Sequence, residues 1–187
     1  MLSGRRLDLL DPSPFDVELD DIAHGLARVA RWNGQTAGLH VFSVAQHSVL
    51  VEAIAGALVP DLPPPARLAV LLHDAAEYVI GDMISPLKAM IGAGYPAVEE
   101  RLRGAIHLRF GLPPVPGPDL VALTKKADRL AAHREATALA GFTRAEADAI
   151  FGRPTIRPPA IDALLDPWPT ADAQQRFRAR FAELGPA

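Results

Sequence analysis

Residues 68–77 read LAVLLHDAAE: five apolar residues lead directly into His73 and Asp74, and Glu77 follows four residues after the histidine. The pattern predicts one helix over residues 65–80. Side chains four residues apart on a helix lie on the same face, so His73 and Glu77 would point the same way. A charged carboxylate is costly to bury unless it is paired or bound to a metal ion. The stretch therefore predicts a functional site inside a helical protein.

The same helical periodicity runs along the rest of the chain. Aromatic residues make up only 6% of it, and proline and glycine gather in a few connectors. These features predict an all-α bundle of about five to seven helices, with a metal site between helices. The predicted helices cover residues 20–30, 42–58, 65–80, 96–110, 119–140 and 171–184.

We expect a single domain over residues 1–187, because a chain of this length suits one hydrophobic core. The core of the domain would cover about residues 20–140. Residues 141–187 would form a C-terminal extension, in which the proline-rich segment 153–169 crosses the surface in extended form. The last predicted helix carries an apolar stripe that includes Phe177, so it should pack on the core.

The composition excludes several classes of protein. The chain has no cysteine, which rules out disulfides and thiolate chemistry, so imidazole and carboxylate groups would hold any metal ion. The net charge of −3 argues against duplex nucleic acid or an anionic membrane as a partner. No apolar run approaches the about 18 residues that span a bilayer. Acidic residues and proline precede any apolar stretch, so we expect no signal peptide and a cytoplasmic protein.

Two further ionisable residues interrupt apolar helix faces. His47 lies in the apolar stripe of the second predicted helix, and Asp128 lies among the alanine and leucine residues of the fifth. Together with His73 and Asp74 they suit one divalent metal ion bound by nitrogen and oxygen. Each residue alone has a simpler interpretation, because a lone histidine on an apolar face is usually hydrogen-bonded within the core and Asp128 could pair with Lys125.

The order and spacing of His47, the adjacent pair His73 and Asp74, and Asp128 resemble those of the HD-domain metal-dependent phosphohydrolases. Residues 73–88, HDAAEYVIGDMISPLK, look like the 5′-deoxynucleotidase branch of that family. The resemblance implies that these four residues hold one divalent ion. On softness, Co²⁺, Mn²⁺, Zn²⁺ and Fe²⁺ suit such a site about equally, and Mg²⁺ is also kept as a candidate because the identity of the ion is open.

The same resemblance assigns the catalytic residues. Glu77 would activate the attacking water, and Asp82 would meet the sugar hydroxyl. The pair Arg31 and Trp32, shortly before the first ligand, also looks like the deoxynucleotidase branch. Arg31 would hold the phosphate and Trp32 would lie against the nucleotide. One departure is Gln46, where many deoxynucleotidases have glutamate.

Further substrate contacts are expected around this motif. Ser85, Pro86 and Lys88 end the string that resembles the deoxynucleotidases. Lys125, three residues before the last ligand, is a second candidate for phosphate by its charge and position. His40 could contact phosphate, but it is more simply a surface histidine, and His24, His107 and His133 receive no role.

The expected reaction is hydrolysis of a 2′-deoxynucleoside 5′-monophosphate to the deoxynucleoside and phosphate. The alternative is a deoxynucleoside triphosphate triphosphohydrolase, which releases intact triphosphate. A non-catalytic nucleotide-binding HD domain is a third hypothesis, although such domains lose ligands or the glutamate, and this chain keeps both. The expected partner is a small nucleotide, and family habit suggests a homodimer or a larger homo-oligomer.

Overall fold

The computed structural model describes residues 1–92, 94–154, 156 and 159–185. Within these residues the chain forms helices, and the only strand-like pairing is an isolated bridge between Ala30 and Ser43. The all-α prediction is thereby confirmed. The α-helices are α1 (Leu19–Leu26), α2 (Val44–Leu58), α3 (Pro64–Leu71), α4 (Glu77–Ile80), α5 (Ser85–Ile91), α6 (Gly94–Arg109), α7 (Pro118–Ala138), α8 (Arg144–Phe151), α9 (Pro159–Asp162) and α10 (Thr170–Leu184). Short 3-10 helices are η1 (Pro14–Asp16), η2 (Arg31–Gly34) and η3 (Ala163–Leu165).

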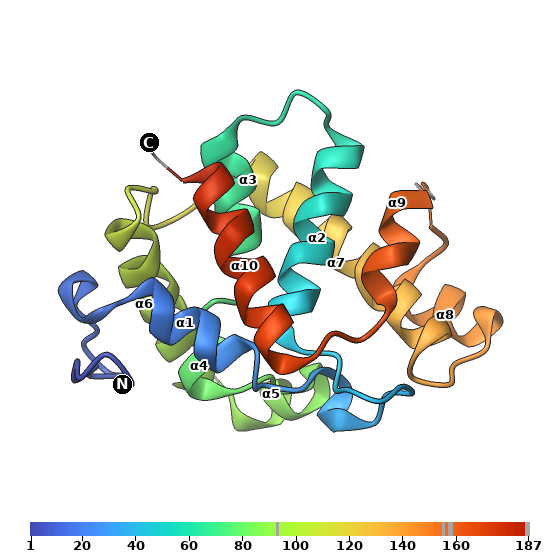
Figure 1. Cartoon of the computed structure of the whole chain (residues 1–187), viewed down its shortest axis with the longest axis horizontal. Helices are drawn as coiled ribbons and strands as arrows, with labels where there is room; N and C mark the ends of the chain where they lie inside the picture. The colour runs from blue at the N-terminus through green and yellow to red at the C-terminus, as the bar shows by residue number, and fades with distance from the viewer. Residues whose placement is uncertain (93, 155, 157–158, 186–187) are drawn as a thin grey trace.

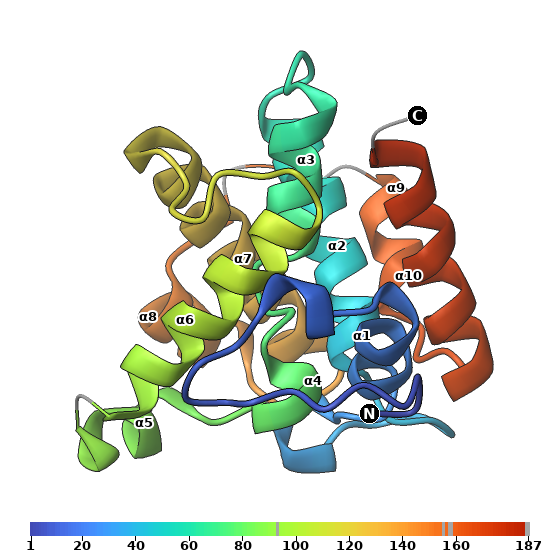
Figure 2. The same ribbon diagram turned by 90° about the vertical axis from the view of Figure 1, so that its left-hand side faces the viewer.

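Helix α2 is the centre of the bundle (Figure 1). It packs against α3, α7 and α10, and Figure 2 shows α7 and α10 on opposite sides of it. A central helix must be apolar around most of its surface. Accordingly, Leu50, Val51 and Ile54 are all buried, and His47 is buried with them. Any polar side chain on α2 therefore faces other helices rather than water.

Two apolar clusters hold the bundle together. One joins α1, α3, α6 and α10, and the other joins α2 and α7. Phe177 of α10 is fully buried in the first cluster, as the stripe on that helix predicts. Burying such a side chain contributes about 1.5–3 kcal/mol. The C-terminal helix is thus an integral part of the core.

The predicted helix over residues 65–80 is wrong as a single element, because α3 ends at Leu71. The backbone then turns through hydrogen bonds between residues three apart, such as Glu77 N–H to the carbonyl of Asp74 at 3.0 Å. The carbonyl of Val70 accepts from both the backbone N–H and the ring Nδ1 of His73, at 3.2 and 2.9 Å. That carbonyl is no longer free for the next helical bond, so the helix stops where the ionisable residues begin.

Other boundaries also differ from the predictions. Helix α1 ends at Leu26 rather than near residue 30, because the following backbone pairs with the segment before α2: Arg31 N–H donates to the carbonyl of Phe42 at 2.8 Å. Segment 153–169 is not simply extended, since it contains α9 and η3 and buries Ile161. Residues 155, 157 and 158 of that segment lie outside the described residues.

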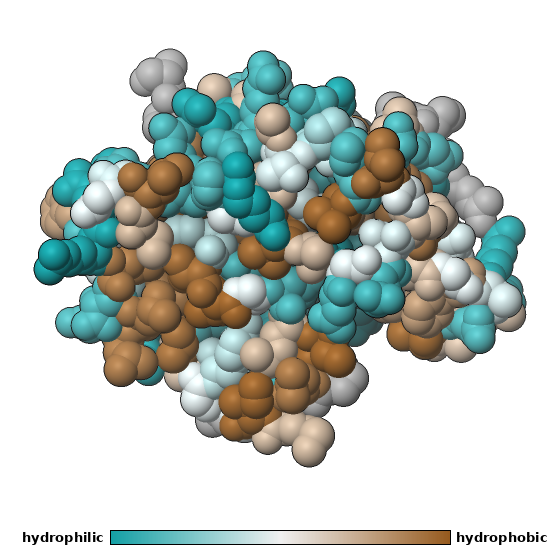
Figure 3. Space-filling model, turned by 60° about the horizontal axis from the view of Figure 1, so that its bottom comes forward, coloured by the Kyte–Doolittle hydropathy of each residue, from teal (hydrophilic) through white to brown (hydrophobic). Residues whose placement is uncertain are grey.

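The surface carries an apolar patch over α5. Ile84, Leu87, Met90 and Ile91 are all exposed there, and Figure 3 shows brown surface at this end of the molecule. Among the described residues, every helix is too short or too polar to cross a bilayer.

Candidate metal centre

The residues of the predicted ligand set come from three parts of the fold. His47 lies in the first turn of α2, where the hydroxyl of Ser43 caps the helix by accepting from the N–H of Gln46. His73 and Asp74 lie in the turns between α3 and α4, and Asp128 lies midway along α7. Because α2 packs against both α3 and α7, these side chains meet inside the bundle.

The distances place the four side chains around one point. His47 Nε2 is 3.3 Å from Asp128 Oδ1 and 3.5 Å from Asp74 Oδ2. His73 Nε2 is 3.1 Å from the same oxygen of Asp74. One ligand atom from each of His47, His73 and Asp128 lies within 4.8 Å of the others, so this group could bind a metal ion.

The two imidazoles are oriented for ligation. His47 Nδ1 donates to Glu135 Oε1 at 2.6 Å, and His73 Nδ1 donates to the carbonyl of Val70 at 2.9 Å. Both acceptors lack a hydrogen to give, so the ring proton lies on Nδ1 in each case. The Nε2 atoms of both histidines are buried without a hydrogen-bond partner among the described residues. An imidazole held at one nitrogen with the other one free is the usual arrangement of a metal ligand.

Glu135 is the supporting residue that the sequence analysis missed. It is fully buried, and it also accepts from Trp32 Nε1 at 2.8 Å and lies 3.5 Å from Arg31 Nε. Burial opposes its ionisation, but the charges of His47 and Arg31 lower the pKa of Glu135 to about 2. The sequence did carry a signal for this residue. Glu135 follows Asp128 by seven residues, or about two helical turns, so the two carboxylates lie on the same face of the predicted helix.

The electrostatics of the cluster favour a cation. Burial opposes ionisation of Asp74 and Asp128, but the imidazoles beside them outweigh it and hold both carboxyl pKa values below their ordinary range, that of Asp74 well below. Burial and Arg31 oppose protonation of His47, yet the three surrounding carboxylates raise the pKa of its ring well above the ordinary value. Negative charge thus converges on the two Nε2 positions, where it favours positive charge, either a proton on His47 or a bound cation.

Glu77 differs from the other carboxylates because it has few partners. Its side chain is 2% exposed, Oε2 makes no hydrogen bond among the described residues, and Lys88 Nζ is 3.8 Å from Oε1. Burial, with the negative charges of Asp74 and Asp82, raises the pKa of Glu77 to about 9. A carboxyl group with such a pKa beside a ligand cluster suits proton transfer.

Arg31, Trp32 and Asp82 lie together on one side of the cluster. Arg31 Nη1 donates to Asp82 Oδ2 at 3.0 Å, and their side chains are 15% and 12% exposed. The Trp32 ring packs against Phe142 and Phe151, with ring centroids 5.6 and 6.1 Å apart. The three residues that the resemblance assigns to the substrate therefore have protein partners already.

The other expected substrate residues lie on α5 and α7. Lys88 Nζ donates to Glu99 Oε1 at 3.0 Å. Lys125 is exposed on α7. Ser85 and Pro86 begin α5, and their side chains lie outside the described part of the chain.

A cavity of about 470 Å³ opens beside the cluster. Three of the predicted ligands, His73, Asp74 and Asp128, line it together with Lys125, and α6 and the segment before α7 form its other walls. A volume in this range is typical of small-molecule sites, at about 300–1,000 Å³. The candidate metal centre therefore has an open approach for a ligand.

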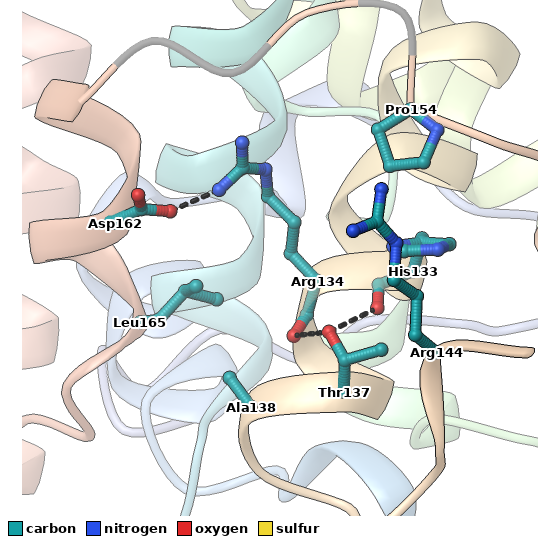
Figure 4. Close-up of a pocket in the computed structure, with 8 residues that line it drawn as sticks. All are labelled: His133, Arg134, Thr137, Ala138, Arg144, Pro154, Asp162 and Leu165. Carbon is teal, nitrogen blue, oxygen red and sulfur yellow. Dashed lines mark hydrogen bonds and ion pairs between the residues drawn. The ribbon is translucent and has the colours of Figure 1, made fainter. Parts of the chain in front are cut away.

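A second cavity, of about 300 Å³, lies between α7, α8 and the segment with α9 and η3 (Figure 4). His133 and Arg134 of α7 line it, and each has a carboxylate partner: His133 Nε2 is 2.8 Å from Asp148 Oδ1, and Arg134 pairs with Asp162. This cavity contains none of the expected site residues.

Comparison with known proteins gives two relatives. The chain is 58% identical over 154 residues to the uncharacterized protein RCAP_rcc00048 of Rhodobacter capsulatus, a match that covers 82% of this chain and 79% of that protein. It is 34% identical over 100 residues to the uncharacterized protein YfdR of Escherichia coli, covering 54% of this chain and 51% of that protein. No family model matches the sequence. Neither relative's name states an activity.

Proposed function

This chain belongs to the same family as the Rhodobacter capsulatus protein, and we propose that it is a metal-dependent phosphohydrolase of the HD-domain type. Its substrate would be a 2′-deoxynucleoside 5′-monophosphate. The proposal rests above all on one observation: two buried imidazole nitrogens without partners, on His47 and His73, converge with the carboxylates of Asp74 and Asp128. A buried polar atom without a partner costs about 1–3 kcal/mol, so a bound ion gives a physical reason for the arrangement.

The ligand set would be His47, His73, Asp74 and Asp128, with Glu135 holding His47 in place. Imidazole and carboxylate donors suit Co²⁺, Mn²⁺, Zn²⁺, Fe²⁺ or Mg²⁺. A divalent ion bound there supplies a Lewis acid for the phosphoryl group.

Glu77 would carry out the two proton transfers of the reaction. Its carboxylate would take a proton from water as the new oxygen–phosphorus bond forms. It would return that proton to the 5′ oxygen of the sugar as the old bond breaks, so that the products are the deoxynucleoside and phosphate. Burial and the negative charges of Asp74 and Asp82 raise the pKa of Glu77 to about 9, so the ionised form that takes the proton would depend on positive charge beside it, from the bound ion and from Lys88. Lys88, 3.8 Å from Glu77, supplies a positive charge that favours the ionised form.

Arg31 and Asp82 would contact the substrate, by resemblance to the deoxynucleotidases. A guanidinium suits phosphate, and a carboxylate accepts a hydrogen bond from the sugar hydroxyl. Their mutual ion pair of 3.0 Å keeps both groups oriented at the edge of the cluster. Trp32 would meet the nucleotide from the same side.

Triphosphate release is the second candidate. The observation that favours it is the exposed cation Lys125, which lines the same cavity as Asp128 and could meet a longer phosphate chain. The two reactions give different products, orthophosphate or intact triphosphate. A non-catalytic nucleotide-binding domain is the third hypothesis, and it would give neither.

A product assay tests the proposal. Metal-stripped protein re-supplied with Co²⁺ or Mn²⁺ is incubated with matched deoxy- and ribonucleoside mono- and triphosphates, and products are separated by chromatography. We expect orthophosphate from the deoxynucleoside monophosphates. Glu77→Gln should lower kcat by about 100-fold or more, within the range for removal of a general base. Glu183→Gln, on the exposed side of α10, is the matched control and should leave kcat unchanged. No turnover of any nucleotide with metal bound would contradict the proposal.

A further inference from the structure

Two residues of helix α6 that line the larger cavity each carry a buried polar atom without a hydrogen-bond partner among the described residues. The atoms are Nε of Arg103 and Nε2 of His107. The residues are four apart, so both side chains lie on the same face of the helix. Neither belongs to the candidate metal centre or to the residues that the proposed reaction uses. Their lack of partners among the described residues therefore calls for a separate explanation.

His107 presents a hydrogen-bond acceptor. Its side chain is nearly fully buried, with the residue 1% exposed, and Nδ1 donates to the carbonyl of Pro113 at 2.9 Å. Burial lowers the pKa of His107, although the bond to Pro113 opposes the shift, so the ring is neutral at pH 7. With its one proton on Nδ1, the ring leaves a bare lone pair on Nε2.

Arg103 presents a hydrogen-bond donor. The Nε–H of a guanidinium can only donate a hydrogen bond. Among the described residues Arg103 forms no ion pair, although Glu99 and Glu100 line the same cavity. One residue with a spare donor and one with a spare acceptor thus line the same cavity.

The remaining walls suit a flat ring. Val115, Pro116, Leu120 and Val121 also line this cavity. The hydroxyl of Thr124 already donates to the carbonyl of Leu120 at 2.8 Å, so it adds little polarity. Apolar walls with a few convergent polar groups are the usual make-up of a site for a small heterocycle.

We propose that this cavity binds the base of the nucleotide whose phosphate lies at the metal centre, and that it prefers bases with a ring N–H beside a carbonyl, namely guanine and thymine. The N–H would donate to His107 Nε2, and the carbonyl oxygen would accept from Arg103. Guanidinium groups favour such carbonyl oxygens in base recognition. The inference rests on the proposed function, because it takes the ligand to be a nucleotide.

Equilibrium binding tests this proposal without turnover. The metal-loaded Glu77→Gln chain is titrated by calorimetry with the 5′-monophosphates of deoxyguanosine, thymidine, deoxyadenosine and deoxycytidine, and with deoxyribose 5-phosphate, which lacks a base. We expect the first two to bind about 10-fold more tightly than the others, the effect of one well-placed hydrogen bond to a charged group.

Variants then assign the preference to α6. Arg103→Met and His107→Leu should each weaken binding of deoxyguanosine monophosphate by about 10-fold or more and leave deoxyribose 5-phosphate unchanged. His107→Gln, which keeps an acceptor oxygen, should restore part of the loss. Arg101→Met is the matched control, because Arg101 is exposed on the same helix and donates to the carbonyls of Ala97 and Leu10. Circular dichroism verifies that each variant is folded.

Each contrary result has a distinct meaning. Equal weakening of the base-less ligand by Arg103→Met would show that Arg103 holds phosphate, and it would overturn the base site. Tighter binding of adenine or cytosine nucleotides, or no effect of either α6 variant, would overturn it as well. Hydrolysis by the unmutated chain without any base preference would overturn this inference alone. A base preference in binding, with no hydrolysis of any nucleotide, would overturn the proposed function alone.

Discussion

Helix α7 lines two cavities, and the buried polar groups of the two are arranged differently. Beside Asp128, the Nε2 atoms of His47 and His73 have no hydrogen-bond partner among the described residues. Further along the same helix, His133 Nε2 pairs with Asp148, although its Nδ1 makes no hydrogen bond among the described residues. Arg134 pairs with Asp162 (Figure 4). A paired group needs nothing further to be stable, whereas a set of unpaired groups around one point predicts a ligand. The comparison therefore separates a candidate metal centre from a structural junction.

Removing Asp128 should have the largest effect. Asp128→Ala takes away one carboxylate of the cluster, so we expect binding of Co²⁺ or Zn²⁺ to weaken by more than the about 10- to 100-fold typical of residues that only support a ligand. Calorimetric titration of the metal into stripped protein measures it. Asp148→Ala, in the other cavity, is the control and should bind metal as the unmutated chain does. Equal losses of metal affinity in both variants would contradict the assignment of the metal centre to the cavity beside Asp128.

Glu135→Gln should have the next largest effect. The amide can still accept from His47, but it lacks the charge that balances His47 and Arg31, so metal affinity should fall by about 10- to 100-fold. Glu52→Gln is the matched control, because Glu52 is also a buried glutamate and pairs with Arg67 and Arg180 away from the cluster. That variant should lower the free energy of unfolding and leave metal affinity unchanged. If Glu135→Gln bound metal normally, its support of His47 would be unimportant.

The pH dependence of the free energy of unfolding should show that His107, in the larger cavity, is neutral in the folded chain. Burial lowers the pKa of His107 below the ordinary value of 6.5, so the unfolded chain takes up a proton that the folded ring resists. Its contribution to stability is present above pH 6.5 and is lost as the pH falls towards the folded pKa. In urea unfolding of the metal-free chain, the free energy of unfolding should therefore fall less between about pH 7 and about pH 5 in His107→Gln than in the unmutated chain. His40→Gln serves as the control, and an unchanged slope in His107→Gln would contradict a neutral ring.

Much of the fold was predictable because it depends on local periodicity. The apolar stripes indicated the helices that became α2, α6, α7 and α10, within a few residues at each end. Helix α8 was missed although its sequence begins with a capping box, in which Thr143 and Glu146 bond to each other's backbone N–H groups. The end of α3 was not predictable from periodicity, since it depends on the ring of His73 reaching the carbonyl of Val70.

The candidate site divides in the same way. Ionisable residues on apolar faces pointed to His47, His73 and Asp128 before any contact was known, and the structure brings them together. Glu135 lay on the same face of the same helix as Asp128 and could have been included on spacing alone. Arg103 and His107 could not have been predicted from spacing, because an atom without a hydrogen-bond partner is recognised only once the surrounding helices are in place.

The smallest effect should come from the second cavity. Asp148→Ala removes the carboxylate that accepts from His133 Nε2 at 2.8 Å and leaves that nitrogen without its partner. Because this bond joins α7 to α8, we expect the free energy of unfolding to fall by about 1 kcal/mol, the usual net worth of such a bond. Trp32 packs on Phe142 and Phe151 at either end of α8, so its fluorescence reports whether the loosened helix disturbs the edge of the metal cluster. An unchanged Trp32 spectrum with normal metal affinity would establish the junction as structural, whereas a loss of metal affinity would show that the two cavities are coupled through α8.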